Sequence, residues 1–67
     1  MVDIKELENE MNEQKVTDAE MAKIIGKDIS TWYRRKLAPQ TFLIGEIENI
    51  VDSLSLSDEK AIHIFLA

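Results

Sequence analysis

Apolar residues recur along the chain at intervals of three and four, the spacing that lines one face of an α-helix. At the N-terminus this spacing joins Ile4, Leu7 and Met11, with Asp3 and Glu6 placed as a capping box in front of them. The stretch IHIF alternates as a strand does, but it is short and lies within a capped helical segment. The pattern predicts an all-α chain with five helices, at about residues 4–12, 18–25, 29–37, 42–54 and 58–66.

Capping residues and helix breakers delimit the second and third helices. Thr17 is placed to cap the second helix, with Glu20 reaching back to it. Gly26 ends that helix, because glycine readily adopts the left-handed conformation that follows a helix. Asp28 then caps the third helix, and Pro39 lies beyond its end. A tight turn is therefore expected between the two helices.

The C-terminal part of the chain favours two further helices and a dimer. Thr41 is a candidate cap for the fourth helix, whose first turn is weakened by Gly45, and Ser57 caps the fifth. Beyond residue 60 every residue except His63 is apolar, which is more than one buried face of a small domain accommodates. We expect a homodimer to cover the surplus through an interface formed by Ile62, Ile64, Phe65 and Leu66.

Length and composition limit the class of protein. Sixty-seven residues make one small domain, residues 1–67, and the lack of cysteine excludes disulfides and thiolate zinc sites. The one histidine, His63, cannot form a metal centre alone. No signal-peptide stretch and no apolar run near the ~18 residues of a membrane span is present. We expect a soluble, cytoplasmic domain with no membrane contact, no metal and no cofactor.

Catalytic chemistry has no support in the sequence. An activated nucleophile beside a base, a pair of convergent acids and a glycine-rich phosphate loop are all missing. We therefore expect a protein that is not an enzyme and has no small-molecule substrate.

The distribution of charge changes what the net charge of −5 implies. An acidic domain is a poor candidate for indiscriminate binding to nucleic acid. Residues 23–40, however, carry five basic residues and one acid, whereas the segments before and after hold seven and five acids. We call residues 23–40 the basic segment. Such a segment can hold a polyanion locally, while acidic flanks make binding weaker and more sensitive to salt.

Residues 22–32 have the spacing of a helix-turn-helix, with Ala22 four residues before Gly26 and Trp32 six residues after it. An ordinary helical hairpin can have the same spacing. TDAEMAKIIGKDISTWYRR resembles the helix-turn-helix of phage repressor and Cro-type regulators. STWYRRKL and the following FLIGEIENIVDSLSLSDEKAIHIFLA resemble very small phage-encoded regulators of this type. The resemblance covers residues 16–67 and implies a compact five-helix lambda-repressor-like helix-turn-helix domain that binds DNA.

Three residues depart from the pattern of that family. Asp18 stands where the family commonly has a glutamine that contacts a backbone phosphate, and its charge would repel that phosphate. Lys27 stands where a branched apolar residue usually fills the turn, and Arg35 where the recognition helix usually buries an aliphatic. The long stems of Lys27 and Arg35 could lie along apolar surface with the charge in water.

Two registers of the third helix are open. The ungapped match to the family directs one face at the DNA groove, formed by Ile29, Ser30, Tyr33 and Arg34. Apolar spacing instead favours a core face formed by Ile29, Trp32, Tyr33 and Leu37. We favour this second register, rotated by roughly one residue, in which the exposed face carries Ser30, Thr31, Arg34 and Arg35.

Arg34 belongs to the exposed face in both registers and is the first candidate for a base contact. Its guanidinium can donate two hydrogen bonds to O6 and N7 of guanine. Ser30 and Thr31 are the other candidate base contacts. Phosphate contacts, which fix position rather than sequence, are expected from Thr17, Lys23, Lys27, Arg35 and Lys36.

These features favour a phage-type transcriptional regulator, a Cro-like repressor that binds double-stranded operator DNA as a homodimer, with helix 29–37 in the major groove. The alternative is an antirepressor or antitoxin-like module that keeps the fold but binds a phage repressor or another protein. Asp18 and the net charge favour the alternative, whereas the basic segment favours DNA.

Overall fold

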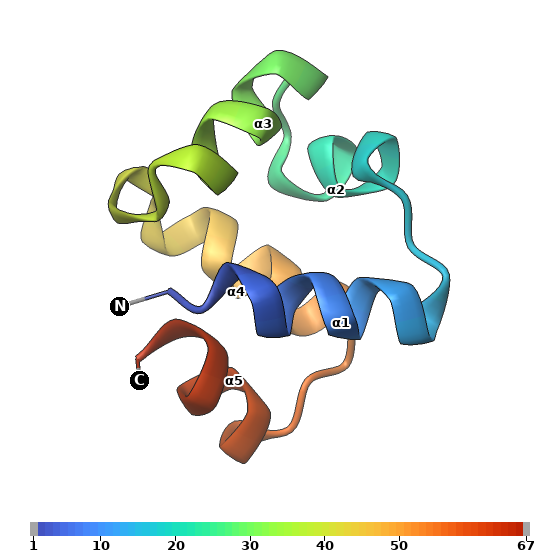
Figure 1. Ribbon diagram of the computed structural model, residues 1–67, viewed down its shortest axis with the longest axis vertical. Coiled ribbons are helices and arrows are strands. Elements are labelled where there is room, and N and C mark those ends of the chain that lie inside the picture. The colour runs from blue at the N-terminus through green and yellow to red at the C-terminus, as the bar shows by residue number, and fades with distance from the viewer. Residues whose placement is uncertain (1, 67) are drawn as a thin grey trace.

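The computed structural model describes residues 2–66, and over this range the chain forms five α-helices, one short 3₁₀ turn and no strand. The elements are α1 (Ile4–Gln14), α2 (Asp18–Ile25), α3 (Ile29–Leu37), η1 (Pro39–Thr41), α4 (Ile44–Ser53) and α5 (Asp58–Phe65). The prediction of an all-α chain with five helices is confirmed. Figure 1 shows α3 at one edge of the molecule, α5 at the opposite edge and α1 crossing between them. None of these helices between residues 2 and 66 combines the length and apolar character needed to cross a membrane.

α1 runs two residues further than the sequence predicted. The Asp3 carboxylate caps its start by accepting the Glu6 N–H at 3.1 Å. At the other end Lys15 adopts a left-handed conformation, with φ of 57°, and its N–H donates to the Asn12 carbonyl at 3.2 Å. A lysine in this position gives no sequence signal, because glycine and asparagine are the usual residues there.

The bounds of α2 and α3 coincide with the predicted ranges, because each is set by a local cap. The Thr17 hydroxyl accepts the Glu20 N–H at 3.1 Å, and the Glu20 carboxylate accepts the Thr17 N–H at 3.0 Å. Gly26 has φ of 72°, the left-handed conformation that ends α2. The Asp28 carboxylate then accepts the Thr31 N–H at 2.8 Å and starts α3. Only two residues lie between Gly26 and α3, so the chain reverses tightly.

α4 begins two residues later than predicted. Thr41, the expected cap, instead donates its hydroxyl to the Ala38 carbonyl at 2.7 Å within η1. The Phe42 N–H donates to the Pro39 carbonyl at 3.1 Å, and Phe42 has a non-helical ψ of 133°. The 3₁₀ turn thus uses the residues expected to open the helix, and α4 begins at Ile44.

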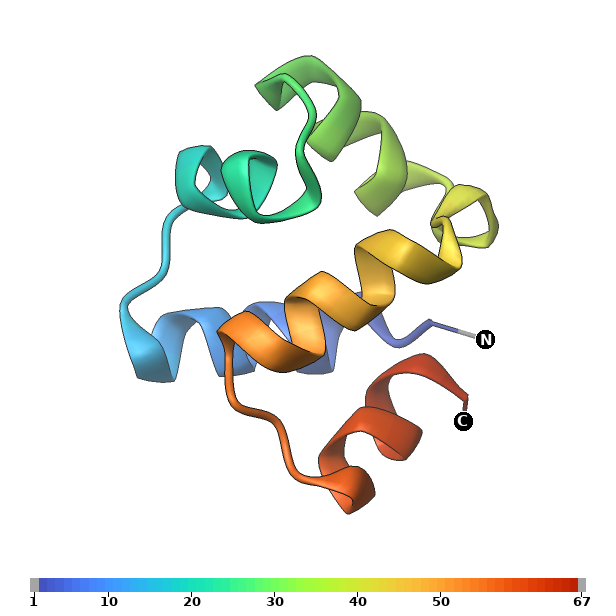
Figure 2. The ribbon, with the colours of Figure 1, turned by 180° about the vertical axis from the view of Figure 1, so that it is seen from behind.

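The core is centred on Trp32, which is completely buried and meets the Phe42 ring edge-on at 5.9 Å between centroids. α2 packs against both α3 and α4. Figure 2 shows α4 crossing the back of the molecule between α3 and α5. The Asp3 N–H donates to the Ile64 carbonyl at 2.6 Å, which ties the start of α1 to α5. The other large side chains with almost no exposed surface are Leu7, Met21, Ile50, Leu54 and Ile64.

Candidate nucleic-acid interface

α3 turns one narrow face to the core and leaves much of its surface open. Trp32 is completely buried, whereas Ile29 is 42% exposed, Tyr33 45% and Leu37 87%. The prediction that these four residues form one core face is wrong for all but Trp32. α3 packs mainly on α2 and η1, and Trp32 makes the contacts there by bonding Asp18 of α2 and meeting the ring of Phe42, which follows η1.

The open face of α3 is the one given by the ungapped register, and the rotated register that we favoured is wrong. This face consists of residues that are all exposed: Ile29, Ser30, Tyr33 and Arg34. Thr31 and Arg35, expected at its centre, are only partly exposed and lie on its flank. Ile29 and Tyr33, which we assigned to the core, therefore lie beside the predicted base-contacting residues.

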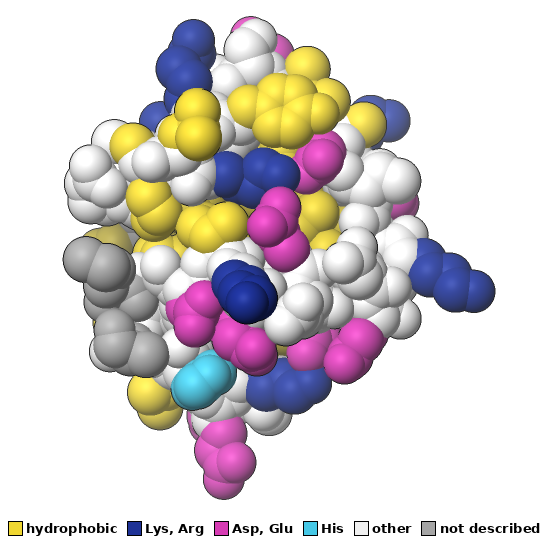
Figure 3. All heavy atoms as spheres, in the orientation of Figure 1, with side chains coloured by type: hydrophobic (Ala, Val, Ile, Leu, Met, Phe, Trp, Pro, Cys, Tyr) yellow, Lys and Arg dark blue, Asp and Glu magenta, His cyan; other side chains and the backbone are white. Residues whose placement is uncertain are grey.

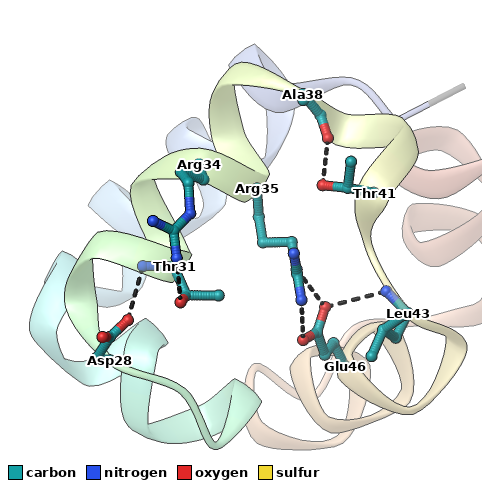
Figure 4. A network of polar contacts seen from close by, with 8 residues as sticks. All are labelled: Asp28, Thr31, Arg34, Arg35, Ala38, Thr41, Leu43 and Glu46. Atoms are coloured by element: carbon teal, nitrogen blue, oxygen red, sulfur yellow. Dashed lines mark hydrogen bonds and ion pairs between the residues drawn. The ribbon is translucent and has the colours of Figure 1, made fainter.

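Arg34 lies on the solvent side of α3 within a short chain of hydrogen bonds (Figure 4). Its Nη2 donates to Thr31 Oγ1 at 3.0 Å. Hydrogen bonds with Thr31 are the largest cause of a lowered pKa at Asp28, the capping carboxylate of α3. Within residues 2–66 no carboxylate forms an ion pair with Arg34, so its charge faces solvent while Thr31 orients its guanidinium.

Arg35 points the other way, toward α4, and its predicted phosphate contact must be corrected (Figure 4). Its Nε donates to Glu46 Oε1 at 2.9 Å and its Nη2 to Glu46 Oε2 at 3.1 Å. Glu46 is only 4% exposed and also accepts the Leu43 N–H at 3.0 Å. Burial alone would raise the pKa of Glu46, but the bonds from Arg35 and Leu43 outweigh it and the pKa is lowered. Arg35 therefore joins α3 to α4, at the position where the phage-repressor pattern that the sequence resembles usually has a buried aliphatic.

Lys36 is also held inside the molecule, and its predicted phosphate contact must be corrected too. Its Nζ lies 3.0 Å from Glu8 Oε2 and 3.1 Å from Asp18 Oδ1, and the side chain is 16% exposed. The ammonium also lies over the rings of Trp32 and Tyr33, at 5.7 and 5.4 Å from their centroids. Burial opposes the charged form, but the two carboxylates prevail and the pKa of Lys36 is raised. Figure 3, in the orientation of Figure 1, shows basic and acidic side chains in contact near the centre of the view, beside hydrophobic ones.

Asp18, the first departure from the family pattern, has an internal role. Its Oδ1 accepts the Trp32 indole N–H at 2.7 Å as well as the Lys36 ammonium. The indole bond is the largest cause of the lowered pKa of Asp18, and Lys36 adds to it. The ammonium of Lys36, which Asp18 shares with Glu8, reduces the repulsion of phosphate expected from Asp18.

Lys23 and Lys27 complete the basic segment and are both exposed. Neither forms an ion pair within the part of the chain that the structure describes. Thr17 is exposed at the start of α2, where its hydroxyl is shared with Glu20 in the cap. The cations that remain open on this side are thus Lys23 and Lys27 near the turn and Arg34 on α3.

The predicted dimer residues divide into two pairs. Ile64 and Phe65 are 2% and 6% exposed and belong to the core of the same chain, so they must be removed from the predicted interface. Ile62 and Leu66 are 57% and 74% exposed. Leu66 borders a groove of about 240 Å³ between α4 and α5, with an almost wholly apolar lining that includes Ile44. The apolar surface open to a partner is therefore formed by α4 and α5 together.

Comparisons with protein-family models, with curated proteins and with solved structures find no match for this chain. Within residues 2–66 no cluster of three or more histidine, cysteine or acidic side chains is placed to hold a metal ion. A function can therefore be inferred from the geometry of α2, of α3 and of the surface formed by α4 and α5.

Proposed function

We propose that the protein is a sequence-specific DNA-binding regulator of the phage repressor and Cro type. In this proposal the chain has a lambda-repressor-like fold, α2 and α3 are its helix-turn-helix, and α3 enters the major groove of double-stranded operator DNA. Binding at an operator would repress or switch transcription from the adjacent promoter.

The observation that carries the proposal is the open face of α3. α3 follows α2 across a three-residue turn and leaves its outer side to solvent, and that side presents Ser30 and Arg34. Arg34 is held by Thr31 alone and keeps its charge unpaired by any carboxylate of residues 2–66. A guanidinium oriented in this way can donate to both O6 and N7 of guanine. Such a contact is worth about 1–3 kcal/mol in discrimination against another base.

The other proposed DNA contacts come from exposed polar and basic residues that are not paired within the described part of the chain. Ser30 is one turn before Arg34 and can bond a base edge, whereas Thr31 positions the guanidinium. Lys23 and Lys27, near the turn, supply phosphate contacts, whereas the hydroxyl of Thr17 is already used in the cap with Glu20. Arg35 and Lys36 have no part in this set, since both are paired internally.

A dimer completes the proposal. Two copies that meet through the apolar surface of α4 and α5, centred on Ile44, Ile62 and Leu66, bury side chains that are otherwise 57–77% exposed. A twofold protein of this class places its two recognition helices about 34 Å apart, one turn of DNA. The operator would then be an inverted repeat with that spacing.

A gel-shift titration against the DNA flanking the gene, at two salt concentrations, tests the proposal. We expect retardation of a specific fragment, weaker at high salt because phosphate contacts release counterions. Arg34→Ala should weaken specific binding by about 5- to 150-fold, the equivalent of about 1–3 kcal/mol, and leave nonspecific binding nearly intact. Ser53→Ala, an exposed change at the end of α4, is the control. Failure to retard any fragment at low salt would contradict the proposal.

One observation favours a second candidate, an antirepressor or antitoxin-like module that binds a protein. Two of the five cations of the basic segment are paired with acids, while Tyr33 and Leu37 expose apolar surface on α3. Capture of a co-encoded repressor, combined with no DNA retardation, would support this candidate. The same capture should then be lost in Tyr33→Ala and Leu37→Ala but not in Arg34→Ala.

A further inference from the structure

Ile29 is an exposed branched apolar residue at the first position of α3. It is 42% exposed, although Asp28 before it and Ser30 after it are polar residues suited to that surface. Tyr33 and Leu37, the other exposed apolar residues of α3, line a groove that faces Ile4 of α1. Ile29 lies instead at the opposite end of the helix, next to the turn that carries Lys27.

The position of Ile29 relative to Arg34 gives it a chemical role. Both residues belong to the open face of α3, and the N-terminal residues of a recognition helix are those that approach base edges. In the major groove the one apolar group that a base pair offers is the C5-methyl of thymine. An isoleucine side chain that packs on this methyl removes both apolar groups from water, which favours binding. An isoleucine that faces a cytosine amine or a guanine carbonyl would instead leave that polar group without a hydrogen-bond partner.

We infer that Ile29 is a specificity-determining residue that selects thymine by contact with its C5-methyl group. This inference rests on the proposed function, because it needs α3 in the major groove. Arg34 is five positions after Ile29, about 7.5 Å along the helix axis, and base pairs are stacked about 3.4 Å apart. The thymine therefore lies about two base pairs from the guanine that Arg34 contacts.

The test uses uracil, which keeps every hydrogen-bonding group of thymine and lacks only the methyl. After selection of a preferred site from random duplexes, each thymine of one half-site is replaced singly by deoxyuracil. Replacement of the thymine two base pairs from the guanine should weaken binding of the native protein about fourfold, the value of one buried methyl group. Ile29→Ala should bind the thymine and uracil sites equally, and Leu37→Ala, the control on the same helix, should keep the fourfold difference.

The outcomes separate the inference from the proposed function. Specific binding with a uracil effect that disappears in Ile29→Ala supports both. Specific binding in which every thymine tolerates uracil, or in which Ile29→Ala keeps the uracil effect, overturns the inference and leaves the proposed function standing. Selection that returns no preferred site overturns the proposed function and the inference with it.

Discussion

At the scale of single residues, the basic segment divides into cations that hold the fold and cations that face solvent. Arg35 and Lys36 follow Arg34 directly in the chain, yet their charges point toward α4 and α1. A helix rotates about 100° per residue, so three consecutive side chains necessarily face different directions. One of the three is open to solvent, and the other two supply the positive charge that pairs with the carboxylates of Glu46, Asp18 and Glu8.

Replacement of Arg35 tests this division. Arg35→Ala removes two of the hydrogen bonds to the buried carboxylate of Glu46 together with its counter-charge, and we expect the melting temperature to fall by at least ~4 °C. Arg34→Ala, the neighbouring change at an exposed site, should leave the melting temperature within about 2 °C of the native value. Thermal unfolding followed by circular dichroism makes the comparison. An unchanged melting temperature in Arg35→Ala would show that the pair does not stabilise the fold.

These ion pairs could not have been predicted from the sequence, and the reason is distance along the chain. Arg35 bonds a residue 11 positions away, and Lys36 bonds residues 18 and 28 positions away. Periodicity and capping describe neighbours within about four residues and say nothing of such pairs. The exposure of Ile29 was missed for a related reason: helical spacing identified an apolar stripe, but only the packing of α2 shows that Trp32 alone is buried.

At the scale of elements, local chemistry predicted most of the fold. α2 and α3 begin at side-chain caps and are separated by a glycine turn, so their bounds follow from a few adjacent residues. The end of α1 and the start of α4 were less well predicted. Lys15 takes a left-handed conformation against its residue preference, and η1 competes with α4 for the residues after Pro39.

The two glycines, Gly26 and Gly45, allow a matched test of backbone conformation. A Cβ added at either meets no atom within 4 Å, so packing plays no part in the comparison. Gly26 has φ of 72°, and Gly26→Ala should reduce the free energy of unfolding by about 1–2 kcal/mol. Gly45 lies in the first turn of α4, and Gly45→Ala should increase it by about 0.5–1 kcal/mol.

Denaturant unfolding measures both glycine variants. Gly26→Asn serves as a control, because asparagine tolerates the left-handed conformation and should recover part of the loss. A stabilising effect of Gly26→Ala would contradict the conformation assigned to the turn between α2 and α3.

At the scale of the whole molecule, one carboxylate joins three helices. Asp18 of α2 bonds Trp32 of α3 and shares the ammonium of Lys36 with Glu8 of α1. Its pKa is lowered in the folded protein from the usual 3.8, first by the indole bond. The folded protein therefore binds this proton less readily than the unfolded chain. The contribution of Asp18 to stability is complete above about pH 4 and is lost as the pH falls through its lowered pKa.

Acid unfolding followed by the fluorescence of Trp32, the one tryptophan in the sequence, tests the role of Asp18. Asp18→Asn should lower stability at neutral pH, because Lys36 then loses one of the two carboxylates that it bonds. The same change should make stability less dependent on pH below about 4. Asp52→Asn, an exposed change on α4, controls for the loss of one carboxylate. If stability fell equally steeply with decreasing pH in Asp18→Asn and in the native protein, the stabilising role assigned to the Asp18 carboxylate would be contradicted.

The oligomeric state of the protein is also a property of the whole molecule, and we expect it to depend on the apolar surface of α4 and α5. Leu66 lines the groove between α4 and α5, and Ile62 exposes apolar area one helical turn before it. Neither belongs to α3, the helix that we propose reads DNA. A charge placed there should separate the subunits of the proposed dimer without disturbing the core. Ile62→Glu should therefore sediment as a monomer at concentrations where we expect the native protein to be a dimer. Its affinity for a two-half-site operator should fall at least about a hundredfold, because the second contact is no longer tethered to the first, while its affinity for one half-site stays the same.

Leu37→Asp, at the 87% exposed residue that ends α3, is the control and should leave the dimer intact. A dimer that survives Ile62→Glu and dissociates in Leu37→Asp would instead assign the interface to α3, a face that could not also enter the major groove.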